Sequence, residues 1–168
     1  MESADRVIHP FPPVVDEGCR LLILGSFPSV KSREEGFFYG HPQNRFWRVL
    51  AAVFREDVPD TVAEKEALLL RHRIALWDVI ASCEIRGSSD ASIRDAVPVE
   101  IEQIISIARI EGVICNGALA GKLYQRHLRR ITGLNAMVLP STSPANAAWS
   151  LPRLVEAWRP FLQNCYEP

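Results

Sequence analysis

The chain has 168 residues, of which 48% are hydrophobic, so it is long enough for one compact domain with a full core. Its formal net charge of −1 at pH 7 gives no overall basic signature, and any contact with nucleic acid needs a local patch. The sequence has no apolar run close to the roughly 18 residues of a membrane span and no pattern of a secretory signal, so we expect a cytoplasmic protein without a membrane partner.

Residue spacing argues against a metal or a cofactor. The four histidines show neither HExxH nor clustered ligand spacing, and the sequence has no GxxxxGK(S/T), GxGxxG or GxSxG motif. Four cysteines lie far apart, form no CxxC pair and are expected to be reduced, mostly buried thiols: Cys19, Cys83, Cys115 and Cys165. We therefore expect neither a metal nor a cofactor.

The first part of the chain alternates between a strand pattern and helix patterns. Residues 1–19 hold three prolines and are expected to form an extended lead-in to a domain that spans 20–168. A short apolar run at 20–25 ends in glycine, which predicts a strand buried on both faces. An irregular segment, 25–44, leads to apolar residues at helical spacing, and Asn44 is well placed as the N-cap of that helix.

The middle of the chain predicts a helix, a strand, a loop and a second helix. Residues 61–73 favour a helix, and the pair Thr61 and Glu64 fits a capping box at its start. A second apolar run predicts a strand at 74–80. It is followed by a loop over 81–92 that is rich in Ser and Gly, and by a helix over 98–108.

The last third repeats the same alternation. A short apolar run at 112–117 again ends in glycine and predicts a third strand, with a helix over 118–130 after it. The run 136–140 predicts a fourth strand, which opens into the loop 141–146, and a final helix begins near Ser150. Strands that alternate with helices predict an α/β fold, namely a single-domain three-layer α/β/α architecture with a central four-stranded parallel sheet.

Function is expected in the loops that leave these strands. In open α/β sheets the ligand lies beyond the carboxyl ends of the strands. Two of the loops carry long motifs, which read Gly25-Ser26-Phe27-Pro28-Ser29 with its continuation Phe38-Tyr39-Gly40-His41-Pro42-Gln43-Asn44-Arg45-Phe46-Trp47, and Ser141-Thr142-Ser143-Pro144-Ala145-Asn146. These motifs and the order of the elements resemble the uracil-DNA glycosylase superfamily, most closely its hypoxanthine-DNA glycosylase branch, over roughly residues 20–162.

Two departures from the superfamily pattern are informative. Mismatch-specific relatives carry a catalytic Asn at the third position of the first loop, where this chain has Phe27. In the hypoxanthine branch, the resemblance implies that this function passes to Asn44. The second motif lacks the His that stabilises the leaving base in classical uracil enzymes, which also sets this chain apart from them.

The resemblance implies a site built from both motifs, with Asn44 as the catalytic residue. The residues expected to bind the substrate are Gly25, Ser26, Phe27, Pro28, Ser29, Tyr39, His41 and Asn116. Those expected to contact the DNA backbone are Lys31, Arg45, Ser141, Thr142, Ser143, Pro144, Ala145 and Asn146.

Several of these residues have an ordinary structural alternative. Asn44 can simply cap its helix, and Tyr39 can be a core aromatic rather than the wall on which a base stacks. Asn116 can bind the backbone in a tight turn, and His41 can pin its loop instead of facing a phosphate. We interpret Asp78, in an apolar strand, as a strand-end carboxylate satisfied by the backbone or an Arg rather than as a catalytic base.

The resemblance implies a monofunctional DNA glycosylase that acts in base excision repair. Such an enzyme hydrolyses the N-glycosidic bond of a deaminated base in DNA, here most closely hypoxanthine. One alternative is a glycosylase specific for uracil or for mismatches, and another, from a different class, is a non-catalytic module that binds nucleotides or damaged DNA. The expected partner is DNA with a deaminated base, bound by a monomer associated with the nucleoid.

Overall fold

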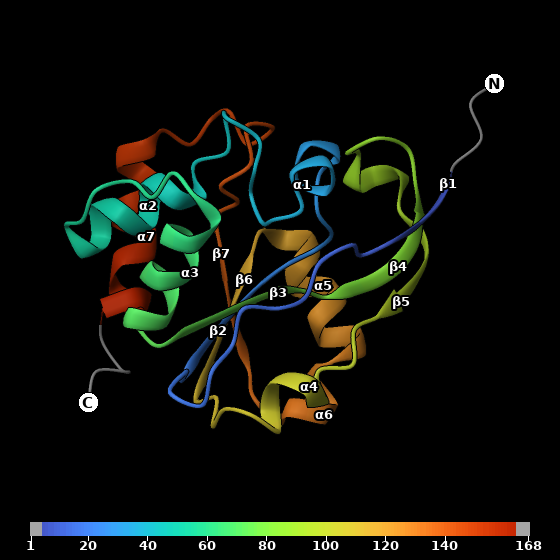
Figure 1. Cartoon of the computed structure of the whole chain (residues 1–168). Helices are drawn as coiled ribbons and strands as arrows, with labels where there is room; N and C mark the ends of the chain where they lie inside the picture. The colour runs from blue at the N-terminus through green and yellow to red at the C-terminus, as the bar shows by residue number, and fades with distance from the viewer. Residues whose placement is uncertain (1–4, 164–168) are drawn as a thin grey trace.

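The main sheet is the four-stranded parallel sheet that the sequence predicts. The computed structural model describes residues 5–163. The strands are β2 (Leu21–Gly25), β3 (Ile74–Asp78), β6 (Gly112–Asn116) and β7 (Ala136–Leu139), and their order in the sheet is β3-β2-β6-β7 (Figure 1). Every pairing between them is parallel. Their carboxyl ends therefore meet at one edge of the sheet.

The two central pairings of β2 fix what stands at that edge. All residues of β2 and β3 are buried, as expected for apolar strands covered on both faces. Leu21 pairs with Ile74 on one side and with Gly112 on the other. The same register places Gly25 opposite Asp78 at the carboxyl ends of the two strands.

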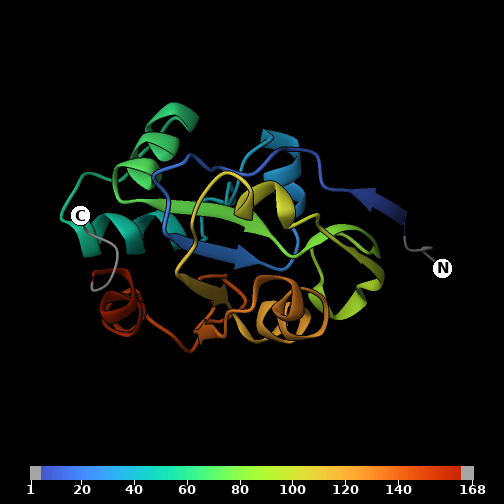
Figure 2. The same ribbon diagram turned by 90° about the horizontal axis from the view of Figure 1, so that it is seen from below.

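Helices cover both faces of the main sheet, which confirms the three-layer α/β/α architecture. Seen from below, α3 (Val62–Arg71) lies on one side of the sheet, and α5 (Ala118–His127) and α7 (Leu151–Gln163) lie on the other (Figure 2). Helix α2 (Phe46–Phe54) packs against α7. The predicted helix over 118–130 is split, because α5 ends at His127 and the short α6 (Arg129–Thr132) follows it.

A second sheet was not expected. It has three antiparallel strands in the order β1-β4-β5, namely β1 (Asp5–Ile8), β4 (Ile80–Ile85) and β5 (Arg94–Pro98). Part of the segment expected to be an extended lead-in thus forms a strand. The loop predicted over 81–92 is wrong, because β4 occupies its first half and only a 3-10 turn at Asp90–Ser92 follows.

Pairing over a long sequence separation explains these differences. β4 reads IASCEI, a short mixed segment without a continuous apolar run, but it pairs with β1 across more than 70 positions. The helix predicted over 98–108 is also wrong in extent. Its start belongs to β5, and the helix itself, α4, is the single turn Glu102–Ile105.

Local capping places the first loop. Part of the segment expected to be irregular forms the helix α1 (Val30–Glu35), and Ser29 Oγ accepts a hydrogen bond from Ser32 N at 3.2 Å. At α3 the predicted capping is confirmed, since Thr61 Oγ1 accepts from Glu64 N at 3.1 Å. A side chain therefore sets the start of each helix, and the sequence predicted the Thr61 cap but neither α1 nor its Ser29 cap.

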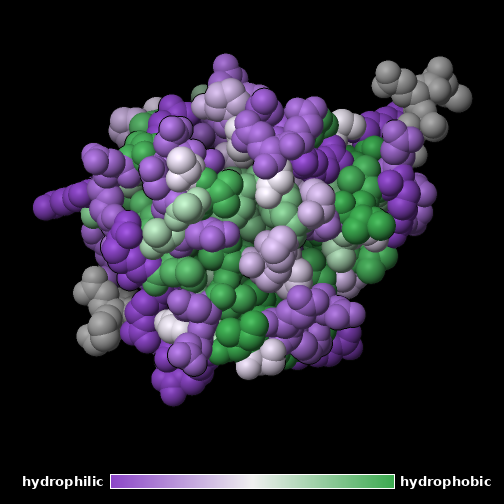
Figure 3. All heavy atoms as spheres, viewed as in Figure 1, coloured by the Kyte–Doolittle hydropathy of each residue, from purple (hydrophilic) through white to green (hydrophobic). Residues whose placement is uncertain are grey.

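Some hydrophobic side chains of the strands lie at the surface. Figure 3 shows hydrophobic side chains over the middle of the molecule and a further group on the side where Figure 1 places β4 and β5. Ile8 in β1 is 73% exposed and Val97 in β5 is 46% exposed.

Among residues 5–163, no helix has the length and apolarity that crossing a membrane requires.

Three of the cysteines behave as predicted. Cys19, Cys83 and Cys115 are buried and free. Burial raises the pKa of Cys19 to about 11 and that of Cys115 to about 12, so both are protonated at neutral pH. Cys165 lies outside the described residues.

Trp158 in α7 anchors the helical layer and supplies a test of the fold. Its side chain is fully buried, and its indole Nε1 donates to Pro140 O at 2.9 Å. Trp158→Ala should lower the free energy of unfolding by about 3–5 kcal/mol, measured by urea denaturation, because it leaves a cavity and an unpaired carbonyl. Arg159→Ala, at the exposed next position, should change it by less than about 0.5 kcal/mol. Equal effects of the two would contradict this packing.

Candidate functional site

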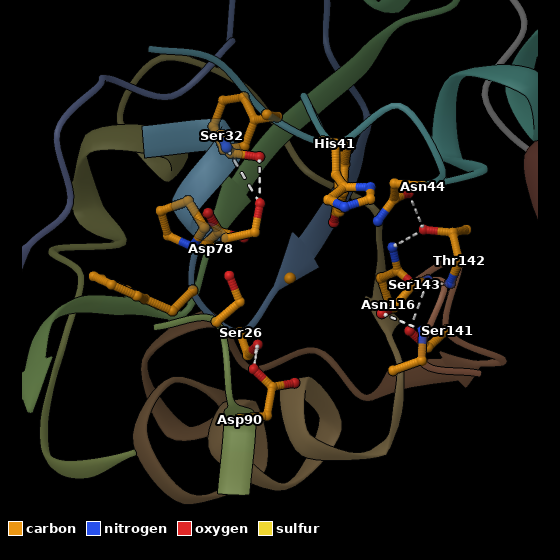
Figure 4. Close-up of a pocket in the computed structure, with 18 of the residues that line it drawn as sticks. Ser26, Ser32, His41, Asn44, Asp78, Asp90, Asn116, Ser141, Thr142 and Ser143 are labelled. Carbon is orange, nitrogen blue, oxygen red and sulfur yellow. Dashed lines mark hydrogen bonds between the residues drawn. The ribbon is translucent and has the colours of Figure 1, made fainter. Parts of the chain in front are cut away.

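A cavity opens at the carboxyl ends of the parallel strands (Figure 4). Its volume of about 340 Å³ falls at the small end of the usual range for ligand pockets. The sequence-predicted site residues that line it are Gly25, Ser26, Phe27, Pro28, Ser29, Tyr39, His41, Asn44, Asn116, Ser141, Thr142, Ser143, Pro144 and Ala145. Both motifs therefore border one cavity, although about 100 positions separate them.

The first loop is held rigidly by serines. Ser32 is buried, and its Oγ accepts hydrogen bonds from Gly40 N at 3.0 Å and Ser29 Oγ at 3.1 Å. This ties the loop after β2 to the aromatic segment that follows α1. Phe27, at the position where mismatch-specific relatives have Asn, is buried in a small cluster with Ile80, Cys83 and Ile85.

Tyr39 forms part of the cavity wall in an unusual backbone conformation. Its φ of 54° is in the left-handed region, which non-glycine residues seldom adopt. One face of its ring stacks on Phe46, with 4.2 Å between the ring centroids and 27° between the planes. Its hydroxyl is buried and has no hydrogen-bond partner among the described residues. Burial, and then the charge of Asp78, raise the Tyr39 pKa far above its usual range, so the hydroxyl keeps its proton.

The N-cap residue of α2 is Arg45 rather than Asn44, but the Asn44 side chain still braces the start of the helix and lines the cavity. Its Oδ1 accepts from Phe46 N at 2.9 Å, in the first turn of α2, and from Thr142 Oγ1 at 2.9 Å. Because both bonds use the oxygen, the amide Nδ2 remains, and no described residue accepts a hydrogen bond from it. The helix contact and the cavity contact thus coexist, and Asn44 presents a hydrogen-bond donor to the cavity.

Thr142 connects Asn44 to Asn116. Thr142 is fully buried, its N–H donates to Asn116 Oδ1 at 3.0 Å, and its Oγ1 accepts from Asn116 Nδ2 at 3.0 Å. In Figure 4, Asn44, Thr142 and Asn116 lie together on one side of the cavity, and Asp78 lies on the other. Asn116 braces the second loop through both ends of its amide, so it does bind backbone, but 26 positions away rather than in its own tight turn.

Arg45 does not line the cavity, and its contacts are internal. Its guanidinium donates to the backbone carbonyls of Ser143 at 2.8 Å, Asn146 at 3.2 Å and Trp149, and Nε reaches Thr142 O at 3.4 Å. A charged fork with several carbonyl acceptors fixes the second loop against the start of α2. The structure therefore gives Arg45 a bracing role, and its expected phosphate contact stays a prediction.

Two further predicted DNA-binding residues lie outside the cavity lining. Lys31 Nζ is 3.5 Å from Glu35 Oε1 across one turn of α1. Asn146 Nδ2 donates to Ser141 O at 3.0 Å and closes the second loop on itself. His41 does line the cavity, while its Nδ1 accepts from Gln43 N at 3.0 Å, so that bond also pins its own loop.

Asp78 is paired with a histidine that the sequence did not single out. His9 Nε2 lies 2.8 Å from Asp78 Oδ2, and the two side chains are only 5% and 4% exposed. The expectation of a backbone or Arg partner for Asp78 is therefore wrong. Gly25 allows the close approach, because a Cβ there would lie 2.4 Å from Asp78 Oδ1 and 2.9 Å from the Tyr39 hydroxyl.

Other lining residues were not among the predicted site residues. They are Ser32, Phe38, Ser88 and Asp90. Ser26 Oγ donates to Asp90 Oδ1 at 3.4 Å, and burial, opposed by that hydrogen bond, raises the Asp90 pKa. No sequence pattern pointed to Asp90. Asp78, in contrast, stood out as a carboxylate within an apolar run. Within residues 5–163, no group of three metal-binding side chains gathers.

The family follows from comparison with known proteins. The family model described as the uracil DNA glycosylase superfamily matches residues 12–162, which include both motifs and the whole main sheet. The chain belongs to the uracil DNA glycosylase superfamily. This confirms the family on which the sequence expectations rest.

Individual relatives are similar over most of their length. A protein of Methanosarcina acetivorans named hypoxanthine DNA glycosylase is 39% identical over 83% of this chain and 89% of its own. One of the same name from Methanosarcina barkeri is 36% identical over 81% of this chain and 86% of its own. A solution NMR structure from Methanosarcina acetivorans, described as a candidate uracil DNA glycosylase, superposes with a TM-score of 0.77 at 32% identity, covering 94% of this chain and 100% of that one.

The bracing role of Arg45 is testable through stability. Arg45→Met keeps much of the side-chain length but removes the donors, so it should lower the free energy of unfolding by about 1.5–3 kcal/mol. Limited proteolysis should then cut first in the second loop, whose carbonyls lose their partner. Arg126→Met, on the exposed side of α5, is the matched control and should leave both measurements unchanged. A second loop as resistant in Arg45→Met as in the unaltered protein would exclude the bracing role.

Proposed function

We propose that this protein is a monofunctional DNA glycosylase that hydrolyses the N-glycosidic bond of deoxyinosine in DNA and releases hypoxanthine, as a step of base excision repair. The observation that carries the proposal is the hydrogen bond between Asn44 and Thr142, which joins the two motifs of the hypoxanthine branch at one cavity. The names of the two Methanosarcina relatives support the choice of base. The expected monomer and its association with the nucleoid belong to the same proposal.

The cavity suits a base that has left the duplex. A purine inside a duplex reaches an enclosed site only after it is flipped out, at a cost of a few kcal/mol, and the weaker pairing of deoxyinosine lowers that cost. The flipped base can stack on the Tyr39 ring in the cavity wall, and stacking of this kind is worth about 1–3 kcal/mol per base. The small, polar loop after β7, from Ser141 to Ala145, borders the cavity where the DNA backbone has to pass.

Asn44 is the residue that we assign to the reaction. Bond breaking puts positive charge on the sugar and negative charge on the departing base, and it needs a positioned water. An amide does not titrate near neutrality, so Asn44 is not a general base. Its Nδ2 faces the cavity because Oδ1 accepts both hydrogen bonds. Nδ2 can donate a hydrogen bond to one lone pair of the water, which leaves the water's other lone pair free to attack the sugar carbon. The Asp90 carboxylate at the cavity wall is available to offset the positive charge.

A set of duplexes tests the proposal directly. Each duplex carries one hypoxanthine, uracil or xanthine in the same sequence, and alkali cleaves the strand wherever a base has been released. Hypoxanthine should be released fastest, and no strand break should appear before alkali, because Lys31 is paired with Glu35 outside the cavity. Faster release of uracil would transfer the proposal to the uracil alternative. Release of none of the bases would exclude the enzyme.

Replacing Asn44 tests its assignment. Asn44→Ala should lower the single-turnover rate on hypoxanthine duplexes by about 10²–10³, the usual effect of losing one positioning group. Duplex affinity should change little, because the DNA backbone contacts remain. Gln43→Ala, at the exposed neighbouring position that does not line the cavity, should keep the full rate. A folded Asn44→Ala protein with the full rate would remove Asn44 from the reaction.

A further inference from the structure

The cavity contains a carboxylate with one oxygen occupied and one oxygen open. Asp78 ends β3, and its Oδ2 is 2.8 Å from His9 Nε2. No described residue donates a hydrogen bond to its Oδ1, which lies over Gly25 where the absence of a side chain leaves room. Oδ1 is not among the buried polar atoms that lack a partner, so it is open to the cavity, where a carboxylate oxygen can accept a hydrogen bond. A ligand that fills the cavity and displaces water therefore has to supply a donor to this oxygen.

His9 is held in its place by aromatic rings. It follows β1 and its ring meets Phe11 edge-on at a centroid distance of 4.6 Å, with Phe27 and Phe38 each at 6.0 Å. Rings on several sides leave the imidazole little freedom to turn away from Asp78. Its Nδ1 is buried and has no partner among the described residues, so Nε2 makes the one polar contact of the ring. Occupation of Oδ2 is thus a fixed property of the site.

We propose that Asp78 reads the edge of the flipped base through Oδ1 alone, and that His9 sets the specificity of the site by occupying Oδ2. The inference rests on the proposed function, since it concerns the base that the cavity takes. A base fits when its edge carries one ring N–H donor, as N1–H of hypoxanthine does. His9 acts through Asp78 and is a positioning residue, while Asp78 contacts the base.

The chemistry of the normal purines explains why one open oxygen is useful. Guanine presents two adjacent donors, N1–H and its amino group, and a free carboxylate would accept both at once. With Oδ2 occupied, the guanine amino group would be buried without an acceptor, which is unfavourable. Adenine presents a lone pair at N1, which the carboxylate repels. The Tyr39 hydroxyl, which also lies next to Gly25, can donate to the adjacent base oxygen that adenine lacks.

The first experiment removes the N–H donor from the base edge that Asp78 is proposed to contact. Single-turnover release is measured from duplexes with deoxyinosine or N1-methyldeoxyinosine, in which a methyl group replaces the edge donor. The unaltered protein should release the methylated base at about one tenth of the deoxyinosine rate or more slowly still. Asp78→Ala should be slow on deoxyinosine and should release the two bases at nearly equal rates, since both the acceptor and the crowding are gone. Equal rates in the unaltered protein, or a full deoxyinosine rate in a folded Asp78→Ala protein, would overturn the proposal.

The second experiment measures specificity without catalysis. Calorimetry gives the affinities of 9-methylhypoxanthine and 9-methylguanine for the protein alone. The preference for hypoxanthine should fall about tenfold in His9→Ala, which frees Oδ2 for the guanine amino group, and should return in His9→Gln, whose amide can again donate to Oδ2. His72→Ala is the matched control, because His72 pairs with Glu56 away from the cavity and its loss should leave the preference unchanged.

Different results would overturn the role of the His9 and Asp78 pair and the proposed function. An unchanged preference in His9→Ala, or no binding of either base to the unaltered protein, would overturn the role of the His9 and Asp78 pair. Failure to release any base from DNA, with the base preference and its His9 dependence intact, would instead overturn the proposed function. If His9→Ala does not fold, the N1-methyl comparison in the unaltered protein still decides whether a single edge donor is read.

Discussion

The site depends on one buried hydroxyl. Thr142 is fully buried, yet its side chain and backbone make hydrogen bonds to Asn116 at the end of β6 and to Asn44 at the start of α2. A hydroxyl has one proton to give, and its acceptance from Asn116 Nδ2 leaves that proton for Asn44 Oδ1. The direction of each bond is therefore determined, and the orientation of the Asn44 amide follows from it. Such a network is strong in a low-dielectric interior, and it leaves only the Asn44 Nδ2 to the cavity.

This orientation is compatible with both interpretations of Asn44. Capping and catalysis compete only if both need the same atom of the amide. Here the oxygen serves Phe46 N and Thr142, whereas the nitrogen is left for the cavity. The helix contact therefore supports the cavity contact, since it holds the amide in one rotamer. Arg45 adds to this by fixing the loop that carries Thr142, so consecutive residues brace the same junction.

Hydrophobic pattern predicts one part of this fold much better than the other. The strands of the main sheet are short, continuous apolar runs such as 21–25, and burial on both faces makes that pattern unmistakable. β1 and β4 alternate or carry charges, and they become strands by pairing with each other and, for β4, with β5 as well. The contact of His9 with Asp78 spans 69 positions and depends on that pairing, so local patterns contain no sign of it. The motif residues around the cavity could be predicted because each motif is nearly continuous in the sequence.

Phe27 links the two sides of the cavity. A phenylalanine at this position cannot supply the amide that mismatch-specific relatives place there, and an amide is instead available from Asn44 across the cavity. The Phe27 ring packs on Ile80 and Cys83 and lies 6.0 Å from the His9 ring, edge to face. It therefore contributes to the apolar setting that holds His9 against Asp78. Phe27 in the first loop and the pair of His9 with Asp78 at the end of β3 therefore depend on each other. The same residue removes one hydrogen-bonding group from the cavity and helps to fix another.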